Sequence, residues 1–137
     1  MANPVPFLLD NLLLIAATLV IGGLLAWPLV RERLGGPSVS TLLATQMINS
    51  RSAQVIDVRE AAEFAEGSLP GARNLPLTQL KERAAELKKD RPVIVVCAHG
   101  RTASIGAARL RTAGFAEVFI LAGGLAAWRE AGLPLRR

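Results

Sequence analysis

The hydrophobic and polar positions of this 137-residue chain follow two patterns, one long apolar run and then an alternation of shorter apolar segments. The long run covers residues 12–30 and contains no charged side chain. As an α-helix, a run of this length extends about 28 Å, close to the roughly 30 Å hydrocarbon core of a bilayer. A buried helix of a soluble domain is rarely so uniformly apolar. The pattern therefore predicts a short N-terminal tail and one transmembrane helix within residues 1–30.

A cleaved signal peptide is the alternative explanation of this run. Such a peptide needs a basic segment before its apolar core and a small-residue cleavage site after it. Residues 1–11 contain no Lys or Arg, and the Trp-Pro-Leu segment at 27–29 is a poor cleavage site. Arg31 and Arg33 follow the run, so the positive-inside rule places the rest of the chain in the cytoplasm. We therefore predict a single-pass anchor in the inner (cytoplasmic) membrane, contacting the lipid bilayer through residues 12–30.

The second pattern fills residues 39–137, after a Gly- and Pro-containing linker at 31–38. Apolar segments suited to buried strands alternate there with amphipathic segments suited to helices, which is typical of an α/β domain with a mainly parallel sheet. The predicted strands are 55–58, 93–96 and 118–121. The predicted helices are one capped by Ser40, then 60–66, 78–89, 101–113 and a last one that follows Gly123-Gly124 and runs through Ala131. In the helix at 101–113, the expected buried positions are Ile105, Ala108 and Leu110.

Composition and charge exclude several functions. The formal net charge is +5, but the basic residues are scattered and aromatic residues make up only 4% of the chain. No base-stacking surface is indicated, so we predict no nucleic-acid partner. A basic domain beside an anionic lipid leaflet explains the charge. The single cysteine excludes an internal disulfide and any metal site that needs several thiolates, and the single histidine adds little.

The candidate chemistry lies in the segment VVCAHGRTAS, which contains Cys97 directly after an apolar strand and shortly before a helix. Parallel sheets bind ligands where loops leave the carboxyl ends of their strands. Backbone N–H groups between Ala98 and Thr102 would converge there on an anion, with Gly100 allowing the tight curve. The same positive potential, with Arg101 beside it, would favour the nucleophilic thiolate. The alternative is a structural cysteine, because free cysteine is among the most buried residue types.

Four segments occur in the order of the motifs of a known family. They are Asp57-Val58-Arg59-Glu60, the segment from Glu63 to Ala72, the loop from Cys97 to Thr102, and Gly123-Gly124-Leu125 through Trp128 with Gly132 and Pro134. Together they resemble the single-domain rhodaneses, a family of sulfurtransferases, and the resemblance covers roughly residues 38–135. One segment alone would be weak evidence, but four in order are specific. The resemblance implies a five-stranded sheet with helices on both faces.

The resemblance also implies a reaction. The Cys97 thiolate would take sulfane sulfur from a small anionic donor such as thiosulfate, forming a persulfide, and would pass it to a thiol or cyanide acceptor. The substrate-binding loop would comprise Ala98, His99, Gly100, Arg101 and Thr102. Asp57 and Arg59 would support the loop as a buried ion pair, with direct substrate contact as the alternative. No metal or organic cofactor is needed, and the anchor favours a membrane protein as partner.

Two departures from the family pattern bear on the reaction. Thr102 stands where many members carry arginine, a difference that bears on the affinity for thiosulfate and on which sulfur donor is preferred. Ser68 stands where the family often has histidine. Phosphatases that resemble this fold need an arginine six positions after the cysteine, where this chain has Ala103, so we favour a sulfurtransferase over a phosphatase or arsenate reductase.

Two further alternatives stay open. One is a non-catalytic rhodanese module that recruits a partner at the membrane, although such modules usually lack the cysteine. The other concerns His99, which is either a general base for Cys97 or a solvent-facing loop residue. We favour the solvent-facing state, because the loop itself activates the thiol in the family that the sequence resembles.

Overall fold

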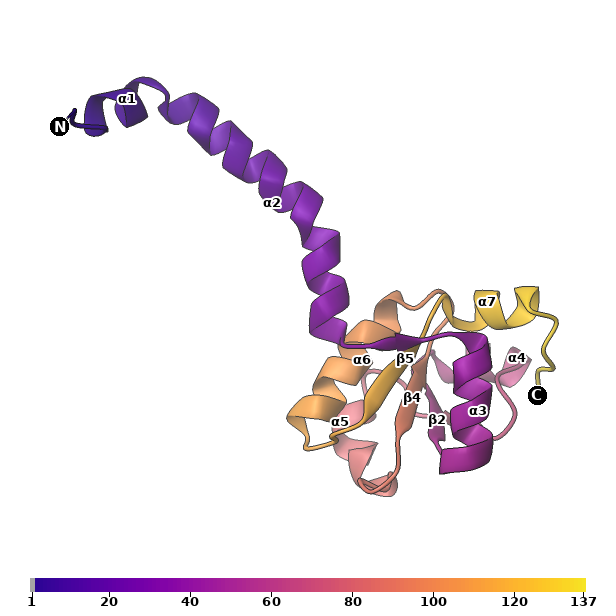
Figure 1. Ribbon diagram of the computed structural model, residues 1–137. Coiled ribbons are helices and arrows are strands. Elements are labelled where there is room, and N and C mark those ends of the chain that lie inside the picture. The colour runs from indigo at the N-terminus through magenta and orange to yellow at the C-terminus, as the bar shows by residue number, and fades with distance from the viewer. Residues whose placement is uncertain (1) are drawn as a thin grey trace. The chain divides into compact units, whose positions relative to one another are not determined.

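The computed structural model describes residues 2–137, except for the side chains of residues 31–35, and it divides the chain into two units. The first unit is Met1–Arg31 and the second is Glu32–Arg137. The first contains the short helix α1 (Val5–Asp10) and most of α2 (Leu12–Gly35) (Figure 1). The second contains the sheet and the remaining helices.

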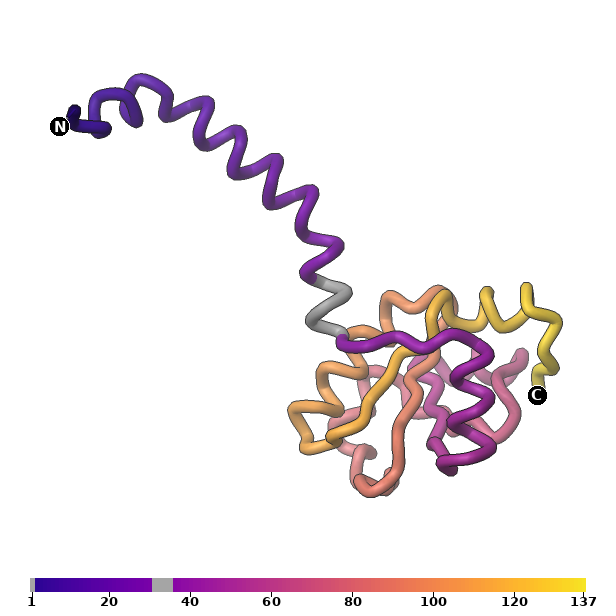
Figure 2. The backbone as a smooth tube through the Cα atoms, in the orientation of Figure 1, coloured from indigo at the N-terminus to yellow at the C-terminus, as the bar shows by residue number. Residues whose placement is uncertain are grey.

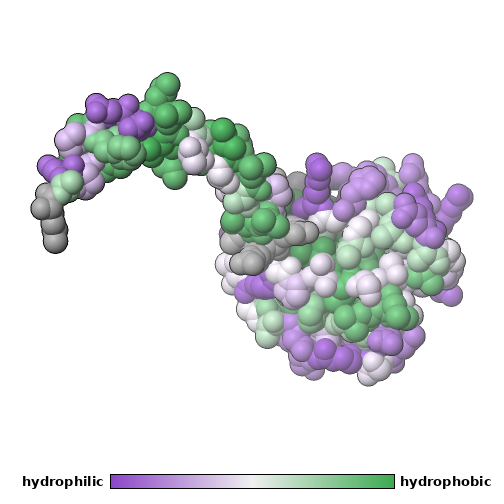
Figure 3. Space-filling model, turned by 45° about the horizontal axis from the view of Figure 1, so that its top comes forward, coloured by the Kyte–Doolittle hydropathy of each residue, from purple (hydrophilic) through white to green (hydrophobic). Residues whose placement is uncertain are grey.

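Helix α2 is apolar over the segment Leu12–Val30, whose mean hydropathy is 2.3. No part of this segment is buried within the protein, and hydrophobic side chains dominate its surface in Figure 3. Among the described residues it is the one helix long and apolar enough to cross a membrane. Pro28 lies inside the helix rather than at its end. The side chains of Arg31 and Arg33, which carry the orientation prediction, lie outside the described part of the structure.

The second unit is an α/β domain with a five-stranded sheet in the order β1-β5-β4-β2-β3, in which every neighbouring pair is parallel. The strands are β1 (Ser38–Val39), β2 (Gln54–Asp57), β3 (Arg73–Asn74), β4 (Val93–Val96) and β5 (Val118–Leu121). The helices are α3 (Thr41–Arg51), α4 (Ala61–Glu66), α5 (Leu80–Arg83), the 3₁₀ turn η1 (Ala84–Glu86), α6 (Arg101–Thr112) and α7 (Gly124–Glu130). The predicted fold class is confirmed.

Two hydrophobic cores lie on opposite faces of the sheet. The central strand β4 directs Val93 and Val95 into a core that includes residues of α5 and α6. It directs Ile94 and Val96 into the other core, which includes residues of α3 and α7. All four side chains are fully buried, as expected for a strand covered on both faces. Strand β1 pairs with β5, so segments from the start of the second unit and from late in the chain are neighbours in the sheet (Figure 2).

The helix predicted over residues 78–89 is shorter in the structure, where α5 gives way to η1. The cause lies in the next segment, since the Gln54 side chain donates to the Lys88 carbonyl at 2.7 Å and accepts from the Lys88 N–H at 2.8 Å. These bonds tie Lys88 to the start of β2 and take it out of a helical path. The apolar positions of the prediction are nevertheless buried, namely Leu80, Ala84 and Leu87.

Helix α6 buries a face that overlaps only in part with the predicted one, since Leu110 is buried as expected but Ala108 is only half-buried. Ile105, expected in the core, is 46% exposed. The buried residues of α6 are Ala103, Gly106, Ala107 and Leu110. A Cβ added at Gly106 would lie 3.2 Å from Cγ1 of Val58, so the helix approaches the sheet along its small residues. This close approach turns Ile105 outward, because small side chains let the helix pack more tightly than a large one would.

Candidate active site

Cys97 lies at the carboxyl end of β4, the middle strand of the sheet. Hydrogen bonding to β2 on one side and β5 on the other fixes the strand that delivers it. The Cys97 side chain is free of disulfide bonding and only 3% exposed, and it packs among the residues of the core that contains α6. A thiol at this place is held in one position by the most buried strand of the domain.

The loop after Cys97 turns back toward its sulfur. The backbone N–H of Gly100 donates to Sγ of Cys97 at 2.8 Å. Gly100 has a φ of 96°, in the left-handed region that glycine tolerates best, and α6 begins at the next residue. An N–H group aimed at Sγ favours negative charge on the sulfur, and the N-terminus of α6 adds the positive end of a helix dipole.

The other predicted loop residues differ in how far their side chains are exposed to solvent. Ala98 and Thr102 are half-buried, while the side chains of His99 and Arg101 are exposed. Among the described residues, the backbone N–H groups of Ala98, His99, Arg101 and Thr102 have no hydrogen-bond acceptor. A run of N–H donors without acceptors at a helix N-terminus suits an anionic ligand.

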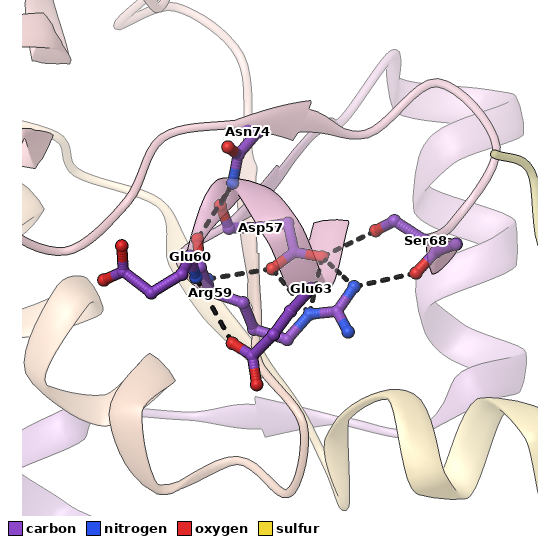
Figure 4. Close-up of polar contacts among 7 residues, drawn as sticks. Asp57, Arg59, Glu60, Glu63, Ser68 and Asn74 are labelled. Atoms are coloured by element: carbon purple, nitrogen blue, oxygen red, sulfur yellow. Dashed lines mark hydrogen bonds and ion pairs between the residues drawn. The ribbon is translucent and has the colours of Figure 1, made fainter. Parts of the chain in front are cut away.

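A buried carboxylate lies at the end of the neighbouring strand β2. Asp57 is fully buried and forms an ion pair with Arg59, in which Nη2 and Oδ2 are 2.8 Å apart (Figure 4). The Arg59 side chain is also nearly buried, with 9% of its surface exposed. Its Nη2 donates in addition to the Gly67 carbonyl at 2.8 Å. The guanidinium thus joins the end of β2 to the segment after α4.

Two residues to which the sequence analysis gave no role in the site complete this cluster. The buried Ser68 donates its hydroxyl to Oδ2 of Asp57 at 2.7 Å. The Asn74 side chain donates to the carbonyls of Asp57 at 3.1 Å and Arg59 at 2.9 Å. The sequence offered one signal for Ser68, namely its departure from the family pattern. The structure shows that the hydroxyl at this position reaches the Asp57 carboxylate. Among the described residues, no buried side-chain nitrogen or oxygen lacks a hydrogen-bond partner.

The structure brings the two groups of predicted residues to the same edge of the sheet, because β2 and β4 are parallel neighbours. The backbone connects them, with the N–H of Val58 donating to the Val96 carbonyl at 3.0 Å. Within the described residues, the side chains of Asp57 and Arg59 form no hydrogen bond with residues 97–102. The ion pair braces the strand next to the cysteine, and the N–H of Gly100 donates to its sulfur.

A cysteine in a tight loop between a central parallel strand and a helix, beside a braced acidic–basic pair, is the arrangement that the resemblance to rhodaneses implies. The model of the rhodanese-like domain family matches residues 40–131, which is more than half of the chain. The chain therefore belongs to the rhodanese-like family.

Individual relatives agree with this assignment. The uncharacterized protein YqhL of Bacillus subtilis is 45% identical over 78 residues, covering 57% of this chain and 62% of YqhL, so less than two thirds of that relative is matched. Thiosulfate sulfurtransferase GlpE of Shewanella oneidensis is 38% identical over 86 residues, covering 63% of this chain and 85% of GlpE. The crystal structure of a rhodanese-related protein from Thermoplasma volcanium has a TM-score of 0.67 and 29% identity, covering 73% of this chain and 97% of that one.

Proposed function

We propose that this protein is a membrane-anchored sulfurtransferase in which Cys97 carries sulfane sulfur from a donor such as thiosulfate to a thiophilic acceptor. The observation that carries the proposal is the 2.8 Å contact from the Gly100 N–H to Sγ of Cys97, at the end of the central strand. The name of the GlpE relative, thiosulfate sulfurtransferase, supports the same activity.

The reaction balances without an external oxidant or reductant. The Cys97 thiolate attacks the outer sulfur of thiosulfate, the sulfur–sulfur bond of the donor breaks, and sulfite leaves with the electron pair. Cyanide then attacks the terminal sulfur of the persulfide, which releases thiocyanate and regenerates the thiolate. Donor, leaving group and persulfide are all anions, so N–H donors of the loop stabilise each of them.

Each predicted residue has a part in this proposal. Cys97 is the nucleophile, and residues 98–102 provide N–H groups and the positive charge of Arg101 for the anion. Asp57 and Arg59 support the loop from the neighbouring strand rather than touching the substrate. A phosphatase function is not supported, because the position where an arginine would be needed is occupied by Ala103, a fully buried residue of α6.

Uptake of sulfur by the purified full-length protein tests the proposal. After incubation with thiosulfate, we expect intact-mass measurement to show a gain of one sulfur atom on the wild-type chain. The gain should be absent from Cys97→Ser and should disappear from the wild type after cyanide is added. If thiosulfate, a polysulfide and a thiol persulfide all fail to load the wild type, the enzyme proposal is wrong and a partner-recruiting module takes its place.

The membrane part of the proposal depends on α2, whose apolar segment is not covered by protein. We propose that residues 12–30 span the inner membrane, that the rhodanese-like domain faces the cytoplasm, and that a membrane protein supplies or receives the sulfur. The chemistry of the apolar segment and the two arginines that follow it support this orientation.

Reporter fusions test the topology. A reporter that works only in the cytoplasm is expected to be active when it is fused after Arg137. The chain should keep its full length and should be found in the membrane fraction. Activity of a periplasmic reporter at the same position would reverse the orientation. A shortened chain in the soluble fraction would identify residues 12–30 as a cleaved signal sequence.

A further inference from the structure

The first turn of α7 contacts the backbone of the Cys97 loop. The Leu125 N–H donates to the Cys97 carbonyl at 2.9 Å, and the Ala126 N–H donates to the Ala98 carbonyl at 3.1 Å. N–H groups in the first turn of a helix have no acceptor within their own helix, so they are available for such bonds. The loop is therefore held from two sides, by β4 before it and by α7 against its carbonyl groups.

Holding these carbonyls also directs the N–H groups of the loop. In a trans peptide the C=O and the following N–H point in opposite directions, and the described residues contain no cis peptide. The bonds from α7 to the carbonyls of Cys97 and Ala98 thus direct the N–H groups of Ala98 and His99 away from α7. These are two of the N–H groups that have no acceptor within the described residues.

Gly124 makes the close approach of α7 possible. A Cβ added at this position would overlap the Cys97 carbonyl oxygen and would lie 2.8 Å from the carbonyl oxygen of Ala98. Both neighbours are backbone atoms, which cannot move aside as the end of a flexible side chain does. Gly124 also has a φ of 60°, so two separate constraints act on this residue.

We propose that the first turn of α7, through Gly124, is a positioning element that orients the N–H groups of the Cys97 loop toward an anionic donor. The inference rests on the proposed function, and it names a determinant of that function outside the loop itself. A side chain at position 124 would separate α7 from the loop, release the two carbonyls and let the peptides that follow Cys97 and Ala98 rotate.

A matched pair of variants separates this contact from backbone strain. Gly132 has a φ of 72°, close to that of Gly124, but a Cβ added there would meet no atom within 4 Å. Gly132→Ala therefore introduces a comparable left-handed alanine in the same part of the chain without touching the loop. Any difference between Gly124→Ala and Gly132→Ala reports the contact with Cys97 and Ala98.

Two measurements on the full-length protein in detergent test the proposal. The first is the rate of persulfide formation with thiosulfate, which Gly124→Ala should lower by about tenfold to a hundredfold, because small displacements of reacting groups have effects of that size. The second is the ratio of Cys97 alkylation rates with iodoacetate and iodoacetamide, which have similar size but differ in charge. Loss of oriented N–H groups should lower this ratio in Gly124→Ala, whereas partial unfolding would expose the thiol to both reagents. Gly132→Ala should match the wild type in both measurements.

A second variant covers the case in which Gly124→Ala does not fold. Ala126→Pro removes one of the two donors, and proline is tolerated in the first turn of a helix. It should lower the alkylation ratio in the same direction. The proposal is overturned if Gly124→Ala, or Ala126→Pro in its place, keeps the wild-type loading rate and ratio, or if Gly132→Ala loses as much as Gly124→Ala. If the wild type itself takes up no sulfur, the proposed function fails, while the alkylation ratio still tests the role of α7.

Discussion

Replacing Cys97 by serine is expected to lower the turnover of thiosulfate and cyanide by at least about a thousandfold, as removal of other catalytic nucleophiles does. Cys97 is the only thiol of the chain, so no neighbouring cysteine can take over. A serine hydroxyl is not ionised near neutral pH and gives no persulfide, because the sulfur–sulfur bond of the intermediate needs the cysteine sulfur. Formation of thiocyanate measures the effect.

The matched control for this experiment is His99→Ala in the same loop. The His99 side chain is exposed and, within the described residues, forms no hydrogen bond, so its removal should change turnover by less than about threefold. A loss of a hundredfold or more would instead be the size expected for a general base. Because serine is close to cysteine in volume and the Gly100 N–H can donate to its hydroxyl oxygen, Cys97→Ser should remain folded. Retention of wild-type turnover by this variant would contradict the assignment of the nucleophile.

The predictability of the fold differed between central and edge strands. Residues 93–96 and 118–121 were recognisable as β4 and β5 because runs of apolar β-branched residues are typical of buried strands. The edge strands β1 and β3 contain two residues each, which is too short for any periodicity. Their pairing is decided by the strands they meet, so only the family resemblance indicated five strands.

The predictability of the candidate site differed between side chains and backbone. The position of Cys97 followed from the strand before it, and the cap at Ser40 followed from its hydroxyl, which accepts from the Leu43 N–H at 3.2 Å. The contact of α7 with the loop leaves no such signal, because both partners are backbone atoms. Gly124 appeared in the sequence only as part of a motif, and the reason for a glycine there required the three-dimensional distance to the loop.

Replacing Arg59 by methionine is expected to lower the free energy of unfolding by about 3–5 kcal/mol, the range found when one partner of a buried ion pair is removed. The Asp57 carboxylate would stay fully buried and would lose its counter-ion. The Ser68 hydroxyl and the backbone N–H of residue 59 would remain as donors, but these two neutral groups cannot replace a guanidinium that bonds to both carboxylate oxygens. Urea unfolding of the full-length protein in detergent measures the loss.

A second arginine–carboxylate pair provides the control. Arg51 and Glu117 are 2.7 Å apart, as close as the buried pair, but their side chains are 48% and 45% exposed. Since water solvates both partners, Arg51→Met should cost only about 0.2–1 kcal/mol. The same substitution at nearly the same distance thus compares a buried pair with an exposed one, and equal losses at Arg51 and Arg59 would show that burial of the Asp57–Arg59 pair is not what matters.

A double variant separates the stranded charge from the lost packing of Arg59. When Arg59→Met is combined with Asp57→Asn, the buried group at position 57 is neutral and no longer needs a counter-ion, so part of the lost free energy should return. The Asn side chain can still accept from the Ser68 hydroxyl, which keeps the segment after α4 connected to β2. A double variant less stable than Arg59→Met alone would show that the carboxylate is stabilised mainly by Ser68 and the backbone. In that case the role of Arg59 would lie in its bond to the Gly67 carbonyl.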